Sequence, residues 1–154
     1  MSIVIDENPT IVIRKAEASD IPQIVEMGSR SLKDGPYSGI IKDNPDQTTL
    51  LAAEVIKKST VLVAEQAAEL IGIMAFILFP HYFTGVLTAG ELIWYVKPER
   101  RTGGTGLKLM WAAERLAKEM GAKQMQVTSP TKEVSALYSR YGYREIETTY
   151  MRNL

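Results

Sequence analysis

The sequence predicts a mixed α/β domain, in which one central sheet of about six strands carries about four helices on its faces. Strand patterns and helical patterns follow one another in the order βαα-βββ-αβ-αβ, which differs from the regular βα alternation of a parallel sheet. The 154 residues, 45% of them hydrophobic, suffice for one ordinary core. We therefore expect a single domain that spans residues 1–154.

The N-terminal third predicts one strand and two helices. The strand covers Ile11 to Lys15, and Ser19 or Asp20 then caps a helix that tolerates Pro22 in its first turn. The apolar positions with helical spacing in this helix are Ile21, Ile24, Val25, Gly28 and Leu32. A loop over residues 33–46, rich in Gly, Pro, Asn and Asp, separates it from the next helix.

The second helix and three strands fill the middle of the chain. Asp46 is expected to cap a helix over roughly Gln47 to Lys58. The expected strands are Thr60–Glu65, Leu70–Phe79 and Glu91–Val96, with a short turn near Ala67-Ala68 and an end at Pro98. The loop before the third of these strands contains His81, Tyr82 and Phe83.

The C-terminal part predicts two more helices and two more strands. One helix follows a run of glycines and ends near Met120, with Gly121 as its stop. Its apolar stripe is Leu109, Ala113, Leu116 and Met120. The remaining elements are a strand over Lys123–Thr128, a helix over Thr131–Arg140 and a last strand over Tyr143–Met151.

Charge and composition exclude several functional classes. Eighteen basic and eighteen acidic side chains balance, so the electrostatic footprint of a nucleic-acid binder is missing. Cysteine is absent, which excludes disulfides, thiolate catalysis and zinc–sulfur sites, and we expect no metal. The longest apolar run, residues 70–80, is too short to span a bilayer, and the first residues lack the basic start of a signal peptide. We therefore expect a cytoplasmic protein without membrane contact.

The stretch RRTGGTGLKLM, residues 100–110, places three glycines where a helix begins. Glycine weakens a helix by roughly 1 kcal/mol relative to alanine, so a compensating gain is expected. Backbone N–H groups and the helix dipole attract an anion at such a terminus, and glycine lets it approach closely. The alternative is a turn that only allows close packing. We call residues 103–106 the glycine segment.

The surrounding residues favour a phosphate ligand without matching the two common nucleotide loops. Leu107 stands where the triphosphate loop needs lysine, and Leu109 stands where the dinucleotide pattern needs glycine. Four basic side chains lie close by: Lys97, Arg100, Arg101 and Lys108. They indicate either phosphate binding or a solvated face.

Two motifs resemble the GNAT superfamily of acyl-CoA-dependent N-acyltransferases. The stretch VKPERRTGGTG, residues 96–106, is similar to the family pattern V-x-P-x-x-[QR]-x-x-G-x-[GA], with Arg101, Gly104 and Gly106 at its loop positions. The stretch ALYSRYGY, residues 136–143, resembles the later motif L-Y-x-x-x-G-[FY]. The resemblance covers nearly the whole chain and implies a GNAT-like central mixed sheet of about six to seven strands flanked by about four helices.

The resemblance implies acetyl-CoA as cosubstrate. Backbone groups of Tyr95 and Val96 would pair with its pantetheine arm like an added strand. The pyrophosphate would be held by the backbone of Arg101, Thr102, Gly103, Gly104, Thr105 and Gly106. Lys97, Arg100 and Lys108 would meet the remaining phosphate charge. Thr131 occupies a position where the family often has an asparagine that touches the cofactor.

The resemblance also implies an acid and a base for direct attack of an amine on a thioester. Tyr138 matches the tyrosine that protonates the leaving sulfur, and a phenol with a pKa near 10 suits that task. The base is left open between Glu91 and His81. Glu91 alternates in phase with Ile93 and Tyr95, while His81 is the single histidine and lies in a loop.

The acceptor is expected in a pocket formed by residues 30–47 and 81–88, because the family builds it from those loops. The side chains that would line it are Asp34, Tyr37, Tyr82 and Phe83. They suit a small primary amine, an amino acid or a peptide N-terminus. A non-catalytic domain that binds CoA as a sensor is the alternative function, and a purely structural domain is a third. Relatives are often dimers, so a homodimer is an alternative to a monomer.

Overall fold

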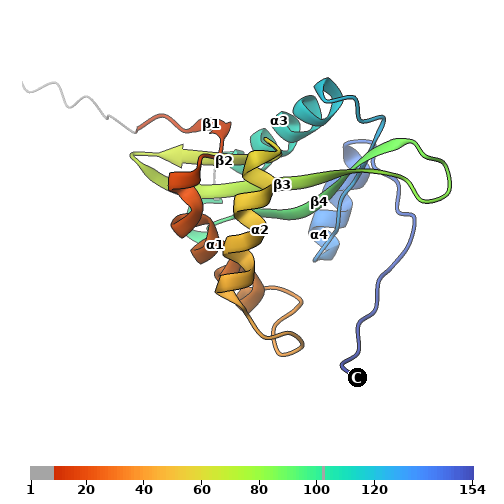
Figure 1. The fold of residues 1–154 in the computed structure, drawn as a ribbon, viewed down its shortest axis with the longest axis horizontal. Coiled ribbons are helices and arrows are strands. Elements are labelled where there is room, and N and C mark those ends of the chain that lie inside the picture. The colour runs from red at the N-terminus through yellow and green to blue at the C-terminus, as the bar shows by residue number, and fades with distance from the viewer. Residues whose placement is uncertain (1–8, 102) are drawn as a thin grey trace, which may run out of the picture.

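The computed structural model describes residues 9–101 and 103–154, which form one mixed sheet with helices on both faces (Figure 1). The strands are β1 (Val12–Lys15), β2 (Val61–Gln66), β3 (Glu69–Pro80), β4 (Leu87–Val96) and β5 (Gln124–Gln126). The helices are α1 (Ile21–Asp34), α2 (Pro45–Lys57), α3 (Thr105–Glu119) and α4 (Lys132–Arg140), with short 3-10 turns η1 (Ala18–Asp20) and η2 (Pro98–Arg100). Neighbouring strands follow the order β1-β2-β3-β4-β5, and the pair β4 and β5 is parallel while the others are antiparallel. The predicted mixed α/β class is confirmed.

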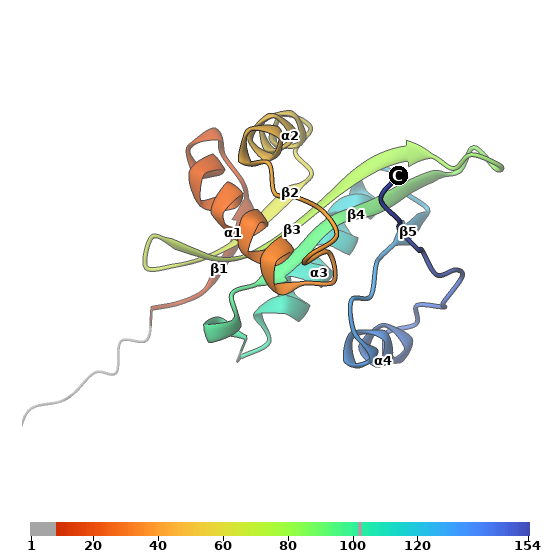
Figure 2. The same cartoon turned by 90° about the horizontal axis from the view of Figure 1, so that it is seen from below.

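Two apolar cores lie on opposite faces of the sheet. Figure 2 shows α1 and α2 above one face, with α3 and α4 on the other side. Met27 and Val55 pack with Ile73 in the first core, and Leu109 and Phe76 belong to the second. Because strand side chains alternate between faces, β3 supplies both cores and is buried along most of its length. Within the described residues, no helix is both long enough and apolar enough to cross a bilayer.

The helix starts lie close to the predicted positions, but both predicted capping residues need correction. Asp20 precedes α1 as expected, but its carboxylate accepts hydrogen bonds from Arg14 (2.8 and 2.9 Å) and from the Glu17 N–H (2.7 Å) instead of capping the helix. Asp46 is not the cap of α2. Asn44 fills that role through its side chain, which accepts from the Gln47 N–H, because Pro45 occupies the first helical position.

The sheet has five strands within the described residues, and the predicted last strand over Tyr143–Met151 is not formed. Its alternating pattern has nothing to pack against. Ile146 and Tyr150 are 70% and 91% exposed, and the preceding strand β5 is only three residues long. A strand needs both a paired edge and a covered face, and this segment has neither. It runs instead toward the loop after α1, where the Asn153 side chain donates to the Ile40 carbonyl (3.0 Å).

Candidate functional site

Strand β4 pairs with β5 over only part of its length, which leaves a free edge near its end. The pairing with β5 covers Thr88 to Gly90, while β4 stays paired with β3 up to Val96. The Lys97 N–H donates to the Ile71 carbonyl (2.9 Å) on the β3 side. Since backbone groups alternate between the two edges of a strand, those of Tyr95 also face β3. The backbone groups of Trp94 and Val96 therefore face the free edge.

Of the two backbone roles predicted for this strand, the free edge agrees with that of Val96 and not with that of Tyr95. Val96 lies at this edge as expected, although its carbonyl already accepts from Arg101 Nε (2.8 Å). Tyr95 does not offer its backbone there, because the register assigns those groups to β3. Its side chain is buried in the core under α1, and the Arg101 guanidinium lies 5.5 Å from the centre of its ring.

A β-bulge in β4 overturns the predicted phase of Glu91. Ala75 faces Ile93 and Phe76 faces Glu91, so Leu92 is the extra residue. One inserted residue moves the side chains before it to the other face of the sheet. Glu91 therefore shares the α3 face with Phe76, opposite to Ile93 and Tyr95.

The bulge brings the two predicted catalytic side chains into contact. The Tyr138 hydroxyl lies 3.4 Å from Glu91 Oε2 and 3.2 Å from the Thr128 carbonyl. Glu91 Oε2 also accepts from the Thr128 N–H (3.0 Å), just beyond β5. Tyr138 is buried, and its ring packs beside Trp94 and Tyr143. A tyrosine hydroxyl and a carboxylate thus meet where β4 and β5 separate.

Burial governs the proton affinities of this pair. Burial raises the pKa of Glu91, although its hydrogen bonds from Thr128 and Tyr138 oppose that shift. Burial, followed by the nearby charge of Glu91, raises the pKa of Tyr138 well above its ordinary value. Tyr138 therefore stays protonated at neutral pH and acts as a hydrogen-bond donor. Glu91 holds a proton more readily than a surface carboxylate.

His81 lies far from this pair. It occupies the tip of the β3–β4 hairpin, where its Nδ1 accepts from the Phe83 N–H (3.3 Å). The strand rise of about 3.4 Å per residue separates the Pro80–Leu87 pair from the Phe76–Glu91 pair by about 14 Å. This separation disfavours His81 as a partner of Tyr138.

The glycine segment leads into α3 with an open N-terminus. Gly103 and Gly104 have positive φ (84° and 75°), a conformation that favours glycine, and a Cβ at either would meet nothing within 4 Å. No side chain caps the helix among the described residues. The first helical bond runs from the Lys108 N–H to the Gly104 carbonyl (3.0 Å), so the preceding N–H groups of α3 have no helical acceptor. This terminus offers donors to an anion.

Two residues in the first turn of α3, Gly106 and Thr105, are closely packed or buried. A Cβ at Gly106 would lie 3.3 Å from the Trp94 ring, and the Trp94 indole donates to the Gly106 carbonyl (2.9 Å). Gly106 is therefore explained by close packing, which the sequence left as the alternative. Thr105 is 1% exposed, and its hydroxyl has no partner among the described residues.

The remaining predicted cosubstrate residues differ in what the structure shows of them. Thr102 lies outside the described residues. Thr131 caps α4, because its hydroxyl oxygen accepts from the Val134 N–H (3.2 Å). The hydroxyl hydrogen of Thr131 is still available for donation.

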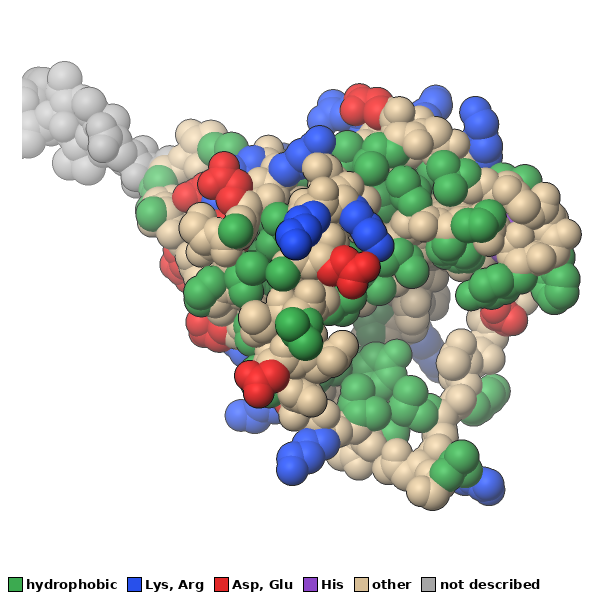
Figure 3. All heavy atoms as spheres, in the orientation of Figure 1, with side chains coloured by type: hydrophobic (Ala, Val, Ile, Leu, Met, Phe, Trp, Pro, Cys, Tyr) green, Lys and Arg blue, Asp and Glu red, His purple; other side chains and the backbone are tan. Residues whose placement is uncertain are grey.

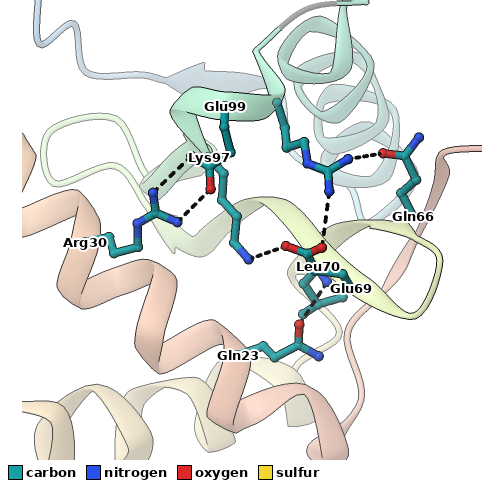
Figure 4. A network of polar contacts seen from close by, with 8 residues as sticks. Gln23, Arg30, Gln66, Glu69, Leu70, Lys97 and Glu99 are labelled. Carbon is teal, nitrogen blue, oxygen red and sulfur yellow. Dashed lines mark hydrogen bonds and ion pairs between the residues drawn. The ribbon is translucent and has the colours of Figure 1, made fainter.

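Two of the four residues of the basic cluster, Lys97 and Arg100, share one acidic partner that the sequence did not connect with them. Lys97 Nζ lies 3.0 Å from Glu69, and Arg100 lies 3.3 Å from the other oxygen of the same carboxylate (Figure 4). Glu99 pairs with Arg30 of α1 (3.0 Å). Lys97 and Arg100 are therefore engaged in ion pairs and are not free for the predicted contact with phosphate. No local pattern reveals these partners, since Glu69 and Lys97 are 28 positions apart.

A cavity of about 410 Å³ lies between α1 and the loop that follows it. Its lining includes Glu26, Lys33, Ser38, Ile41 and Asp43. One oxygen of Asp43, Oδ1, is buried without a hydrogen-bond partner in the described part of the chain. Figure 3 shows that the molecule is also hollowed between this region and the C-terminal segment, with hydrophobic side chains at the bottom of the hollow.

The four side chains predicted for the acceptor pocket do not line this cavity. Tyr82 and Phe83 are 87% and 92% exposed at the hairpin tip, and neither they nor Tyr37 and Asp34 line the cavity. The predicted loop after α1 does contribute to it, through Ser38 to Asp43.

Comparisons with known proteins agree with this geometry. Residues 57–145, more than half of the chain, match the model of an acetyltransferase (GNAT) domain. No curated protein is similar enough in sequence to count as a match.

Solved structures share the fold at low sequence identity. A predicted acetyltransferase with acetyl-CoA from Clostridium acetobutylicum is 22% identical, with a TM-score of 0.74 over 94% of this chain and 96% of that one. The aminoglycoside N-acetyltransferase AAC(6')-Iy in complex with CoA is 16% identical, with a TM-score of 0.74 over 98% and 99%. A ribosomal-protein-alanine N-acetyltransferase from Brucella melitensis biovar Abortus is 15% identical, with a TM-score of 0.71 over 94% and 99%.

Proposed function

Because the chain belongs to the GNAT acetyltransferase family, we propose that it is an N-acetyltransferase that moves the acetyl group of acetyl-CoA to a primary amine. One observation carries the proposal: the uncapped start of α3 lies beside the free edge of β4, and the Tyr138–Glu91 pair lies where that edge begins. In this proposal, residues 1–154 form one catalytic domain.

The described residues fit acetyl-CoA as cosubstrate. The N–H groups from Gly104 to Leu107 would hold the pyrophosphate at the uncapped start of α3. The backbone of Trp94 and Val96 would pair with the pantetheine arm along the free edge of β4. Arg101, Thr102, Gly103 and Thr131 complete the proposed binding set. Acetyl-CoA supplies the thioester, whose C–S bond breaks as the C–N bond forms.

Tyr138 and Glu91 have distinct roles in this proposal. Tyr138 donates its hydroxyl hydrogen toward the leaving sulfur in exchange for its present contacts with Glu91 and the Thr128 carbonyl. Burial keeps this hydroxyl protonated, but it also raises the pKa above the value near 10 that matches a thiolate, so the group acts mainly as a hydrogen-bond donor to the sulfur. Glu91 accepts the proton that the amine loses, and its position beside Tyr138 keeps both groups at the mouth of the gap between β4 and β5. The enzyme needs no covalent nucleophile for this reaction.

We expect replacement of Glu91 with Gln to lower turnover about 100-fold and to remove the acidic limb of the pH–rate profile. Burial raises the pKa of Glu91, so its basic form is lost, as pH falls, at a higher pH than for a surface carboxylate. The wild-type rate should therefore fall earlier on the acidic side. The measurement is kcat/KM against pH, with His81→Gln as the control that keeps the limb. A fully active Glu91→Gln variant would move the base elsewhere.

We propose a small-molecule amine or a peptide N-terminus as acceptor. The cavity beside α1 is lined by two carboxylates, Glu26 and Asp43, and by two cations, Arg30 and Lys33, so it suits a polar acceptor of mixed charge. Relatives of the same fold include enzymes named for aminoglycosides and for a ribosomal-protein alanine. An amine screen should therefore contain both polyamine-like small molecules and short peptides. A cytoplasmic location and a homodimer are parts of the proposal that need separate tests.

A thermal melt of the protein with and without CoA tests the proposal first. Ligand at about 100 times its dissociation constant should add about 2.7 kcal/mol, a shift of several degrees for a domain of this size. Acetyl-CoA followed by thiol release with each amine then tests catalysis. Binding without thiol release under any amine would favour a CoA-binding sensor, and the absence of a shift would contradict the proposal.

A further inference from the structure

The chain enters the glycine segment through the short turn η2, which is held in place by ion pairs from two directions (Figure 4). We propose that Glu69, together with Arg30, positions this turn and thereby the anion-binding start of α3. Neither residue touches the bound anion in this inference. The inference rests on the proposed function, because it takes CoA as the anion.

Glu69 joins both ends of the turn with a single carboxylate. Its Oε1 lies 3.0 Å from Lys97, directly before η2, and its Oε2 lies 3.3 Å from Arg100, the last residue of η2. Gln66 accepts a further bond from Arg100 (3.0 Å). The side chain of Lys97 is only 10% exposed, so its ammonium depends on this partner more than a surface lysine would.

The β2–β3 hairpin presents Gln66 and Glu69 from a rigid, strained turn. Ala67 and Ala68 both have positive φ (51° and 62°), which is unfavourable for residues with a Cβ. Such a two-residue turn fixes the register, and Gln66 and Glu69 face each other as its flanking pair. Strain of this kind persists where the surroundings determine the conformation, and it is enriched at functional sites.

Helix α1 holds the same turn from the other side. The Arg30 guanidinium donates to both oxygens of Glu99 (3.1 and 3.0 Å), a two-pronged geometry that restricts orientation as well as distance. Arg30 lowers the pKa of Glu99 to about 2, so the pair is charged at all ordinary pH values. Gln23 of α1 also accepts from the Leu70 N–H (2.9 Å), which links the helix to the hairpin that carries Glu69.

These contacts matter for Gly103 and Gly104 because the two glycines have no side chains whose packing would fix their place. Gly103 and Gly104 have no atoms within 4 Å of a virtual Cβ, so side-chain packing does not locate them. Their place is set by the residues on either side. Helix α3 fixes the far end through Trp94, and the two ion-pair groups fix the near end through η2.

The positioning role and a purely electrostatic role of Glu69 predict opposite changes in CoA affinity when Glu69 is removed. If Glu69 only neutralised Lys97 and Arg100, its removal would raise the local positive potential and tighten CoA binding. If Glu69 positions the turn, its removal should weaken CoA binding despite the gained charge. The sign of the change separates the two.

The experiment compares Glu69→Gln and Glu99→Gln with the matched control Glu65→Gln. Glu65 lies in the same hairpin, and its replacement removes a similar ion pair, with Arg14 (2.7 Å). This pair contacts β1 and not η2. Calorimetry with CoA should show dissociation constants raised roughly tenfold in the first two variants and within about twofold of wild type in the control. Hydrogen exchange of the CoA-free proteins should show faster exchange at residues 101–107 in the first two variants alone.

Charge reversal provides a rescue. Arg30→Glu and Glu99→Arg should each weaken CoA binding, and the double variant should recover most of the loss, which a change in net charge alone would not produce. Unchanged or tighter CoA binding by Glu69→Gln would overturn the inference. If wild type itself fails to bind CoA, the proposed function fails, and hydrogen exchange at residues 101–107 decides the positioning role by itself.

Discussion

Replacement of Tyr138 with Phe is expected to lower turnover at least tenfold while CoA binding is retained. The substitution removes one hydroxyl and leaves the ring, which packs between Trp94 and Tyr143. Loss of a single donor that serves the transition state typically lowers the rate about 100- to 1000-fold. The measurement is steady-state kcat with the best amine from the screen, together with calorimetric CoA binding.

Tyr143→Phe is the matched control for this experiment. Its hydroxyl is also partly buried and donates to a carboxylate, Glu114 (2.6 Å), but this contact lies on α3 and not at the gap between β4 and β5. Both substitutions should change thermal stability by similar amounts. Turnover within about twofold of wild type in Tyr138→Phe would refute the acid role, whereas an equal loss in Tyr143→Phe would show a packing effect.

Replacement of Gly104 with Ala should weaken CoA binding at least tenfold. A residue with a Cβ at φ 75° carries about 1–2 kcal/mol of strain, and the methyl group would occupy the open space from which a phosphate approaches the N–H groups of α3. The free protein tolerates the methyl group sterically, because nothing lies within 4 Å. Calorimetry with CoA measures the loss.

Gly85→Ala separates strain from ligand contact. Gly85 has a similar φ (69°) and equally open surroundings, but it lies in the β3–β4 hairpin. The two variants should therefore melt at similar temperatures and differ only in CoA affinity. Equal CoA affinity in both would mean that Gly104 serves only the conformation of the turn and does not contact CoA.

Local patterns in the sequence predict the elements that carry local signals. The helix after the glycines begins at Thr105 and ends before Gly121, as capping rules indicate. The strand that ends at Val96 has the predicted end, but it begins at Leu87, four residues before the predicted start. The glycine segment was found from its composition alone. These features depend on residues that are neighbours in the chain.

The missed features depend on distant partners. The face of Glu91 was wrong because a bulge at Leu92 is invisible in an alternating pattern. The last predicted strand failed because its alternation finds no neighbouring edge, and Glu69 was overlooked because its cations lie about thirty positions away. Sequence reasoning thus names candidate site residues but not the distant contacts that hold them in place.

Trp94 touches both ends of the proposed site. Its indole N–H holds the first turn of α3, and its ring lies 5.6 Å from that of Tyr138. The fluorescence of this one indole therefore depends on events at either end. Trp111, the second tryptophan, lies on the outer side of α3 against Tyr141 and is 47% exposed. Replacement of Trp111 would leave Trp94 as the single tryptophan. The fluorescence emission of the protein would then report on the site without an attached dye.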